Sequence, residues 1–261
     1  MFSFFKKKNA SSDSASKYET YIIEDYENAE PIAQYFQTET GITFEKQTSI
    51  LKSKLTIFCK NKQISSFKSC LEKIHIDQQL KQELINYLTT NESYFYRELR
   101  QIQELVSKVA GSQSKVSILC APCSTGEEPY SIAMELFNAG IDSNRFTITA
   151  LDINTNAIQF AQKACYNARS VSKLPATILQ RYFHELNGKY QLQPKVVSTV
   201  GFYVMNIFSL EFQRLGKFDF VFSRNMLIYF DRPTKQKARK ILEDVRSTSS
   251  QEVFFGHADL F

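Results

Sequence analysis

Two neighbouring carboxylates, Glu127 and Glu128, stand where a bound ligand would meet the start of a helix. They follow a turn of small residues, 122–126, whose sequence PCSTG contains a single glycine. The turn lacks the G-x-x-x-x-G-K-[ST] pattern of a phosphate-binding loop, and a dinucleotide-binding turn would need three glycines. Carboxylates at this point repel a pyrophosphate and favour a ligand with cationic groups and hydroxyls. The alternative is that both acids only begin a helix, where unpaired N–H groups and the dipole favour negative charge.

The elements on either side of the turn determine where these acids lie. VSILCA, 116–121, is an apolar run long enough for a strand buried on both faces. After the turn, Pro129 falls in a first helical turn and apolar residues follow at helical spacing. Strand, tight turn and helix form the unit that places a nucleotide-like ligand at the carboxyl end of a parallel sheet. S-adenosylmethionine, with its sulfonium, ammonium and ribose, is a ligand that suits an acidic turn.

A further acid, Asp152, ends the apolar segment RFTITALDI, 145–153, which predicts a second buried strand. An acid in this place is the usual partner of ribose hydroxyls, because a carboxylate accepts two hydrogen bonds in one plane. Asp152 lies 26 residues past Gly126, near the spacing expected for such a unit. It could also simply cap the next helix, 154–164, and this alternative stays open.

Three later segments complete the predicted sheet. VGFYVMNIF, 200–208, predicts a third core strand that ends at Asn206, and KFDFVFSRNMLIYF, 217–230, predicts a fourth that ends at 223–225. A basic helix, 234–247, then leads to a fifth strand, 251–261. Alternating strands and helices predict a Rossmann-like α/β fold with a parallel sheet.

Residues 166–199 interrupt this alternation and predict a small inserted subdomain. Its middle, 176–186, has helical character, and Asn187-Gly188 is a strong signal for a tight hairpin turn. We therefore expect a helix followed by a ribbon of strands.

The first 88 residues differ in character from the rest of the chain. Residues 1–17 end in a serine-rich polar stretch that cannot bury enough apolar surface to order itself, so we expect a flexible tail. Residues 18–88 carry apolar stripes at helical spacing and no strand pattern, which predicts a small all-helical domain. Gly41 is expected to cap its first helix. The stripes are Ile32, Tyr35 and Phe36; Ile50, Leu51, Leu55 and Phe58; and Leu80, Leu84, Ile85 and Leu88.

Charge within this domain is uneven. Eight lysines between Lys46 and Lys81 stand against only Glu72 and Asp77, a local net charge of +6. Lysines on the outer faces of amphipathic helices are commonly just solvated. The functional alternative is a surface that docks an acidic partner, either a helix-rich protein or nucleic acid.

Residues 89–110 connect the two predicted domains and crowd polar side chains against three aromatic ones. Thr90 or Asn91 is expected to cap a helix that carries Arg97. One interpretation is a plain helix–helix connection. The other is that the segment and its helix fold over the ligand pocket and offer Asn91, Ser93 and Arg97 to it.

Composition narrows the class of protein. The hydrophobic fraction of 43% is ample for a core, and the formal net charge of +5 is mild for a nucleic-acid binder. Five cysteines are an odd number in a chain without a secretory signal, which indicates a reducing, cytoplasmic environment. Cys120 and Cys123 form one C-x-x-C, but no second pair completes a zinc site, so we expect no metal. No apolar run approaches the roughly 18 residues of a membrane-spanning helix.

Six motifs, taken in order, resemble those of the CheR-type chemotaxis methyltransferases: NESYFYRE, STGEEPYSIA, ALDIN, MNIF, FSRNMLIYF and FGHAD. The resemblance runs from about residue 30 to the end, and STGEEPYS and RNMLIYF are its most specific parts. It implies a methyltransferase domain over 111–261 that uses S-adenosylmethionine to methylate glutamate side chains of chemoreceptors. It also implies that the helical domain contacts the receptor's cytoplasmic helical bundle, which fits the lysine-rich segment 46–81. We expect a monomer that does not act on nucleic acid.

The resemblance also assigns site residues. Ser93 stands where the family commonly has threonine, Asn206 would suit the adenine amino edge, and Asp152 would suit the ribose. Arg97 would orient the incoming carboxylate or that of the cofactor. Tyr229 would line the methyl channel, unless it is only a packing residue. The implied cofactor-binding residues are Asn91, Ser93, Arg97, Glu128, Asp152, Asn206, Ile207, Arg224 and Asn225. The catalytic roles of Arg97 and Tyr229 are a hypothesis about the mechanism of methyl transfer.

The sequence departs from the family pattern in two places. A glycine-containing turn of the K-P-G-G kind usually precedes the fifth strand, and here residues 246–252 read RSTSSQE. The family also continues past its GHSE motif with a helix and a final antiparallel hairpin, whereas this sequence ends at Phe261. We therefore expect the fifth strand to have an unpaired flank and a less covered apolar face.

Two other functions stay open from the sequence. A nucleic-acid methyltransferase would share the fold, but amino-group methylases generally carry N/D-P-P-Y/F after the fourth strand, and RNMLIYF has no proline there. The second is a cofactor-binding but inactive module that only docks on receptors. Cofactor binding without turnover would identify it.

Overall fold

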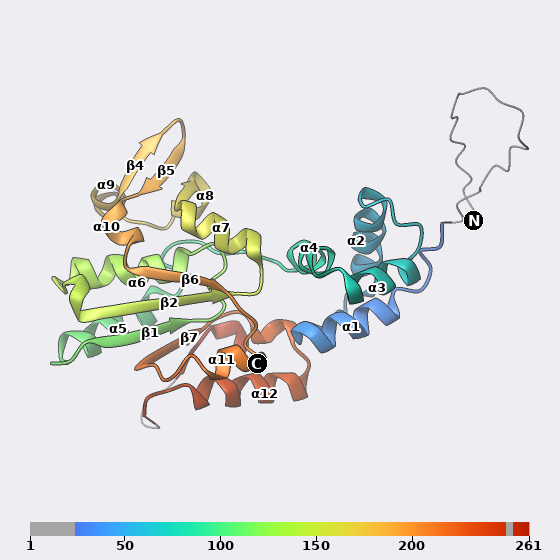
Figure 1. Ribbon diagram of the computed structural model, residues 1–261. Coiled ribbons are helices and arrows are strands. Elements are labelled where there is room, and N and C mark those ends of the chain that lie inside the picture. Colours follow the sequence, from blue (N-terminus) through green and yellow to red (C-terminus); the bar gives the residue numbers. More distant parts are fainter. Residues whose placement is uncertain (1–23, 249–252, 261) are drawn as a thin grey trace, which may run out of the picture. The chain divides into compact units, whose positions relative to one another are not determined.

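The computed structural model describes residues 24–248 and 253–260. It divides the chain into two units, a helical unit that ends at Leu88 and a sheet unit that begins at Thr89 (Figure 1). The expected tail, 1–17, lies outside the described residues, as do residues 18–23 of the expected helical domain and parts of the segment before the fifth strand. No helix in the described parts combines the length and the apolar character needed to cross a membrane.

The helical unit confirms the all-helical prediction over its described residues. The chain turns left-handed at Gly41 (φ 78°), whose N–H bonds the carbonyl of Gln37, so the expected helix cap is confirmed. Phe36, Leu55 and Leu84 lie in the core, but Ile50 is 51% exposed and its assignment to an apolar stripe is wrong. The helices are α1 (Glu30–Thr40), α2 (Thr48–Asn61), α3 (Phe67–Ile76) and α4 (Gln78–Leu88).

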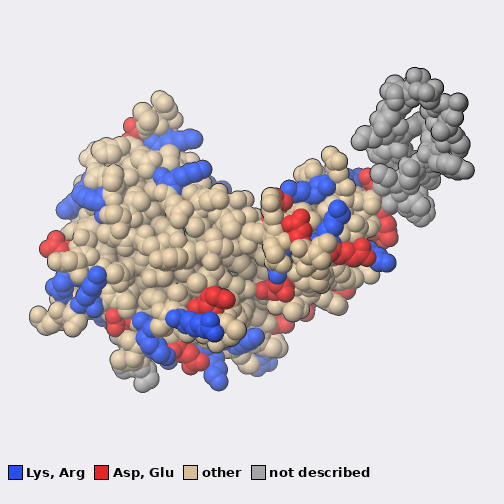
Figure 2. Space-filling model, viewed as in Figure 1, with Lys and Arg blue, Asp and Glu red and all other residues tan. Residues whose placement is uncertain are grey.

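Acidic and basic side chains are interspersed on this unit (Figure 2). Four of the eight lysines form ion pairs with glutamates, all of which lie outside segment 46–81. These pairs neutralise half of the lysines locally, which the charge count over the segment did not anticipate. The pairs are Lys52–Glu27, Lys60–Glu24, Lys62–Glu83 and Lys81–Glu39.

The sheet unit confirms the α/β prediction. Its described main sheet has five strands, all parallel, in the order β6-β2-β1-β7-β8. The chain runs from β1 through β2 to β6 on one side, then crosses to β7 and β8 on the other, so the strand order reverses beside β1. The strands are β1 (Val116–Cys120), β2 (Phe146–Asp152), β6 (Val200–Val204), β7 (Phe220–Ser223) and β8 (Val253–Phe255).

The central strands carry the core of this unit. Ile118 of β1 lies between Ile148 of β2 and Phe220 of β7, and all three are buried. Phe222 stacks on Phe254 of β8 with ring centroids 4.4 Å apart. The helices beside the sheet are α5 (Leu99–Ala110), α6 (Glu127–Asn138), α7 (Thr155–Lys163), α11 (Leu210–Gln213) and α12 (Arg232–Asp244), with short turns η1 (Ser143–Arg145), η2 (Leu227–Tyr229) and η3 (His257–Asp259).

Two strand predictions need correction. The third strand was expected in the core, but β6 lies at the edge of the sheet and its Tyr203 is 53% exposed. The fifth strand is also shorter than expected, because Gly256 ends β8 and the next residues form η3.

The inserted subdomain is a three-stranded antiparallel sheet in the order β3-β5-β4. The hairpin turn is confirmed, since Asn187 (φ 52°) and Gly188 (φ 72°) both take the left-handed conformation that a two-residue turn requires. The helical prediction for 176–186 is wrong after Tyr182, because Phe183 is buried and pairs with Leu192. Its elements are β3 (Cys165–Asn167), α8 (Ala168–Val171), α9 (Ala176–Tyr182), β4 (Phe183–Leu186), β5 (Lys189–Leu192) and α10 (Pro194–Val197).

The predicted helix of the connecting segment begins later than expected. Tyr96 (φ 62°) and Glu98 (φ 50°) are left-handed, so α5 starts at Leu99, and neither Thr90 nor Asn91 caps it. The backbone N–H groups ahead of it are used elsewhere: Phe95 donates to the Ser170 carbonyl at 2.9 Å, and Tyr96 donates to the Ser131 hydroxyl at 3.1 Å. Arg97 therefore lies in a turn and not on a helix.

Candidate active site

The turn between β1 and α6 is fixed by contacts with β2 and with the inserted subdomain. Cys123 N–H donates to the Leu151 carbonyl at 2.7 Å, and the Tyr166 hydroxyl donates to the Thr125 carbonyl at 2.8 Å. Gly126 has φ 92°, and a Cβ there would lie 2.9 Å from the Ala161 Cβ. Only glycine fits this position, which explains the single glycine of the turn.

Asp152 is buried beside this turn. Its carboxylate accepts the Ser124 N–H at 2.8 Å and the Asn154 N–H at 2.9 Å. Burial raises the pKa of Asp152, and these backbone N–H groups oppose the rise. The alternative that Asp152 caps the next helix is wrong, because the Asn154 side chain accepts the Ala157 N–H and caps α7. Asp152 therefore lies at the carboxyl end of β2, and each of its carboxylate oxygens accepts a backbone N–H.

Asn206 and Ile207 follow β6, close to the end of β2. The Met205 N–H donates to the Asp152 carbonyl at 2.9 Å, which brings the chain after β6 beside the end of β2. The Asn206 side chain accepts the Phe208 N–H at 2.9 Å, and this bond fixes its orientation. Ile207 is buried. Asp152, Asn206 and Ile207 thus form one group.

Glu128 and Arg224 form the centre of a second group. They make a buried ion pair between the start of α6 and the end of β7. Arg224 also donates from Nη1 to the Arg97 carbonyl at 2.7 Å, which fastens the connecting segment to the sheet. Asn225, the next residue, is left-handed (φ 59°) and directs the chain away from β7.

Arg97 and Tyr229 interact electrostatically. The Arg97 Nη1 donates to the Glu92 carbonyl at 3.1 Å, and its guanidinium lies 5.6 Å from the Tyr94 ring centroid. Burial raises the pKa of Tyr229 and the positive charge of Arg97 opposes the rise. The two predicted catalytic residues are thus brought into one neighbourhood.

Glu127, at the start of α6, is not among the predicted cofactor-binding residues. It is 2% exposed, and its carboxylate accepts the hydroxyls of Thr125 at 2.6 Å and Ser170 at 3.3 Å, with Ser93 as a further partner. Burial raises its pKa, and the hydroxyl bonds oppose the rise. Ser93 therefore meets a carboxylate from a different part of the chain, whereas Asn91 lies half-buried two residues ahead of it.

Asp259 was also missed. Its carboxylate accepts the backbone N–H groups of Asn225, Ile228 and Gly256, so it ties η3 to the loop after β7. Burial is the main cause of its raised pKa. The FGHAD motif includes Asp259, but the motif alone does not show what the side chain contacts. Only the fold shows that its side chain faces residues 225–228.

Three buried polar atoms at this end of the sheet have no hydrogen-bond partner among the described residues: Ser124 Oγ, Glu128 Oε1 and Ser223 Oγ. They belong to the turn, the start of α6 and the end of β7. A buried polar atom normally has a partner, so three in one region indicate a polar ligand. A carboxylate oxygen with two hydroxyls, next to Asp152, suits the ammonium and ribose of S-adenosylmethionine.

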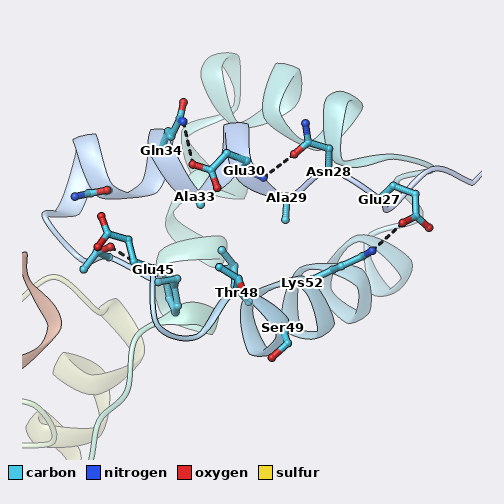
Figure 3. Close-up of a pocket in the computed structure, with 14 residues that line it drawn as sticks. Glu27, Asn28, Ala29, Glu30, Ala33, Gln34, Glu45, Thr48, Ser49 and Lys52 are labelled. Carbon is cyan, nitrogen blue, oxygen red and sulfur yellow. Dashed lines mark hydrogen bonds and ion pairs between the residues drawn. The ribbon is translucent and has the colours of Figure 1, made fainter.

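The C-x-x-C cysteines and a pocket in the helical unit are not part of the predicted site. Burial raises the pKa of the Cys120 and Cys123 thiols, which disfavours reactive thiolates there. A pocket of about 360 Å³ lies within the helical unit, between α1 and the start of α2 (Figure 3). Glu27 at its rim pairs with Lys52 at 2.9 Å, and no residue of the predicted site lines it.

The chain matches known proteins over most of its length. The model of the CheR methyltransferase SAM (S-adenosylmethionine) binding domain matches residues 91–261. A chemotaxis protein methyltransferase of Campylobacter jejuni is 35% identical over 222 residues, which cover 85% of this chain and 84% of the relative. Chemotaxis protein methyltransferase 2 of Vibrio cholerae is 32% identical over 239 residues, 86% of this chain and 82% of the relative. The Escherichia coli chemotaxis protein methyltransferase is 31% identical over 185 residues, 69% of this chain and 64% of the relative.

Proposed function

This chain belongs to the CheR methyltransferase family, and we propose that it transfers a methyl group from S-adenosylmethionine to glutamate side-chain carboxylates of chemoreceptors. The product would be a glutamate methyl ester. The observation that carries the proposal is the group of three buried polar atoms without a hydrogen-bond partner among the described residues, Ser124 Oγ, Glu128 Oε1 and Ser223 Oγ, at the carboxyl end of the sheet. The proposal places the protein in the cytoplasm as a monomer.

The cofactor, when bound, supplies an electrophilic methyl group on a positively charged sulfur. Asp152 would hold its ribose, and Glu128 and the hydroxyls of Ser124 and Ser223 would bind its polar groups. Asn206 and Ile207, which follow β6, would contact the adenine, while Asn91, Ser93 and Asn225 would contact the cofactor from the flanking loops. No metal is needed for this chemistry.

The substrate carboxylate needs no general base, because glutamate is ionised at neutral pH. Catalysis then depends on in-line approach and on exclusion of water, since the opposite charges of the reactants partly cancel in the transition state. Arg97 would orient a carboxylate through paired hydrogen bonds. Tyr229, whose pKa is raised mainly by burial, would wall the methyl channel as a neutral phenol.

The partner would be the cytoplasmic helical bundle of a chemoreceptor. Within segment 46–81 of the helical unit, Lys46, Lys54, Lys68 and Lys73 form no ion pair with a described residue. These four lysines would contact acidic side chains of the receptor.

Peptide mass spectrometry of a receptor cytoplasmic fragment, incubated with the protein and S-adenosylmethionine, tests this function. The expected result is the mass increase of one methylene on glutamate residues, absent when the cofactor is left out. The variant Asp152→Ala should bind the cofactor about tenfold more weakly in calorimetry, because ribose hydroxyls lose their acceptor. Cofactor binding by the wild type without any modified glutamate would favour an inactive docking module instead.

A further inference from the structure

Helix α12 carries a dense cluster of positive charge that the proposed chemistry does not use. Between Arg232 and Leu242 it has five cationic residues and no acidic one. Figure 2 shows blue side chains, with some red ones among them, over the part of the sheet unit where Figure 1 places α12. The cations are Arg232, Lys235, Lys237, Arg239 and Lys240.

This charge pattern opposes the stability of the helix. The positive end of a helix dipole is at its N-terminus, so cations are favourable in the last turn and acids in the first. In α12 the first turn has no acid and the last turn has no base, whereas Glu243 and Asp244 lie at its C-terminal end. Like charges three or four residues apart, such as Lys237 and Lys240, also repel each other. The pattern therefore needs a cause outside the helix.

The structure holds α12 firmly beside the active-site loop. Asp231 caps it by accepting the Thr234 N–H at 2.8 Å, directly after η2, which carries Tyr229. Arg239 donates to the Asp259 carbonyl at 2.7 Å, and its guanidinium lies 4.5 Å from the Phe255 ring centroid. A partner bound to α12 would therefore be held close to the loop that carries Tyr229.

The outer face of the helix is available. Ala238 and Leu242 are buried against the unit, while Arg232, Lys237 and Lys240 are exposed. These three cations form no ion pair with any described residue, unlike four of the lysines in the helical unit. We call Arg232, Lys237 and Lys240 the α12 face.

We propose that the α12 face binds an acidic surface of the protein whose glutamates are methylated, which rests on the proposed function. The substrate must present carboxylates, and complementary charge steers such encounters and fixes their orientation. A membrane surface fits less well, because the apolar side of α12 is already buried and none of its exposed residues is a large hydrophobic one. Single-stranded nucleic acid fits less well, because α12 has no aromatic residue on which bases could stack.

The test compares two triple variants of the full chain that remove equal charge. One neutralises the α12 face with R232Q, K237Q and K240Q. The matched control neutralises three exposed lysines elsewhere in the sheet unit with K115Q, K163Q and K173Q. Binding of an acidic receptor cytoplasmic fragment is measured by fluorescence anisotropy at low and high salt, and methyl transfer is measured in parallel.

The α12 variant should bind the fragment about tenfold more weakly at low salt and with a smaller dependence on salt. Its KM for the fragment should rise by a similar factor, with kcat and cofactor affinity unchanged. The control should bind and react like the wild type. Loss of charge at the α12 face would then have a specific effect beyond the change in net charge.

Equal affinity of the two variants for the fragment would overturn the proposal. The proposal would also be overturned if the α12 variant kept its affinity for the fragment but no longer bound phosphatidylglycerol vesicles or single-stranded RNA. The α12 face would then bind a membrane surface or nucleic acid. If the wild type binds the fragment through α12 but transfers no methyl group, docking stands and the proposed function fails. If the wild type transfers methyl groups and the α12 variant binds the fragment as tightly as the wild type, the docking proposal fails and the proposed function stands.

Discussion

Arg224 and Glu128 form an ion pair whose side chains are only 3% and 10% exposed, and the pair joins the end of β7 to the start of α6. These two residues are 96 positions apart in the sequence. The same guanidinium holds the Arg97 carbonyl, so one side chain organises three segments of the site.

Arg224→Ala should lower the free energy of unfolding by about 3–5 kcal/mol, because it leaves the Glu128 carboxylate buried and unpaired. The double variant Glu128→Met with Arg224→Met should recover much of this loss, since it removes both charges and keeps the volume. Urea denaturation measures both. Equal stability of the single and double variants would show that the unpaired charge is not the cause.

Arg97→Ala should abolish methyl transfer and change the free energy of unfolding by less than about 1 kcal/mol. Among the described residues its guanidinium bonds only the Glu92 carbonyl and lies over Tyr94, and half-exposed contacts of this kind contribute little to stability. Arg97→Lys keeps the charge but loses the paired hydrogen bonds, so it should keep a small part of the activity. Initial rates at saturating cofactor, with a denaturation curve for each variant, provide the measurement. Turnover at the wild-type rate in the alanine variant would refute this role.

Asp259→Ala should weaken cofactor binding about tenfold, because the N–H groups of Asn225, Ile228 and Gly256 lose their acceptor and the loop after β7 loosens. Asp259→Asn keeps one acceptor oxygen and should fall between the wild type and the alanine variant. Calorimetric titration with S-adenosylhomocysteine measures the effect. If both variants bind as the wild type does, the loop is held in place by other contacts.

Glu127→Gln should stabilise the protein more at neutral pH than at acid pH. Burial raises the pKa of Glu127 in the folded state, so the folded protein favours the protonated acid. The contribution of Glu127 to the free energy of unfolding is therefore fully present below the ordinary glutamate pKa. It is lost as the pH rises through the raised pKa of the folded state. Glutamine does not ionise and avoids that loss.

The measurement is the difference in the free energy of unfolding between Glu127→Gln and the wild type, followed from acid to neutral pH. The difference should move in favour of the variant as the pH rises. A difference that is flat with pH would mean that Glu127 keeps an ordinary pKa. Glu185→Gln, which makes the same substitution at an exposed position, serves as the control.

Local patterns predicted the fold well where one signal dominated. The buried run at β1, the acid at the end of β2 and the Asn187-Gly188 turn each have a short-range cause, and the structure confirms these elements. The start of α5 could not be predicted, because it depends on bonds from Phe95 and Tyr96 to distant segments. Tertiary pairing likewise turned the end of a predicted helix into β4.

Some site residues could likewise be predicted from local sequence, whereas others depend on contacts between distant segments. Asp152 could be placed at the carboxyl end of a strand from sequence spacing alone. The roles of Glu127 and Asp259 depend on which groups face them across the fold, such as Ser170 or the Asn225 N–H, and no periodicity encodes those contacts. The pairing of four lysines in the helical unit was missed for the same reason.

The most direct test of glutamate methyl-ester formation is transfer of labelled methyl from S-adenosylmethionine to receptor-containing membranes, followed by mild alkali. A methyl ester on a carboxylate hydrolyses under these conditions, so the label should be released as volatile methanol. Methylated nitrogen does not release methanol in this way. Label that is transferred but stays bound after alkali would contradict a glutamate methyl ester as the product.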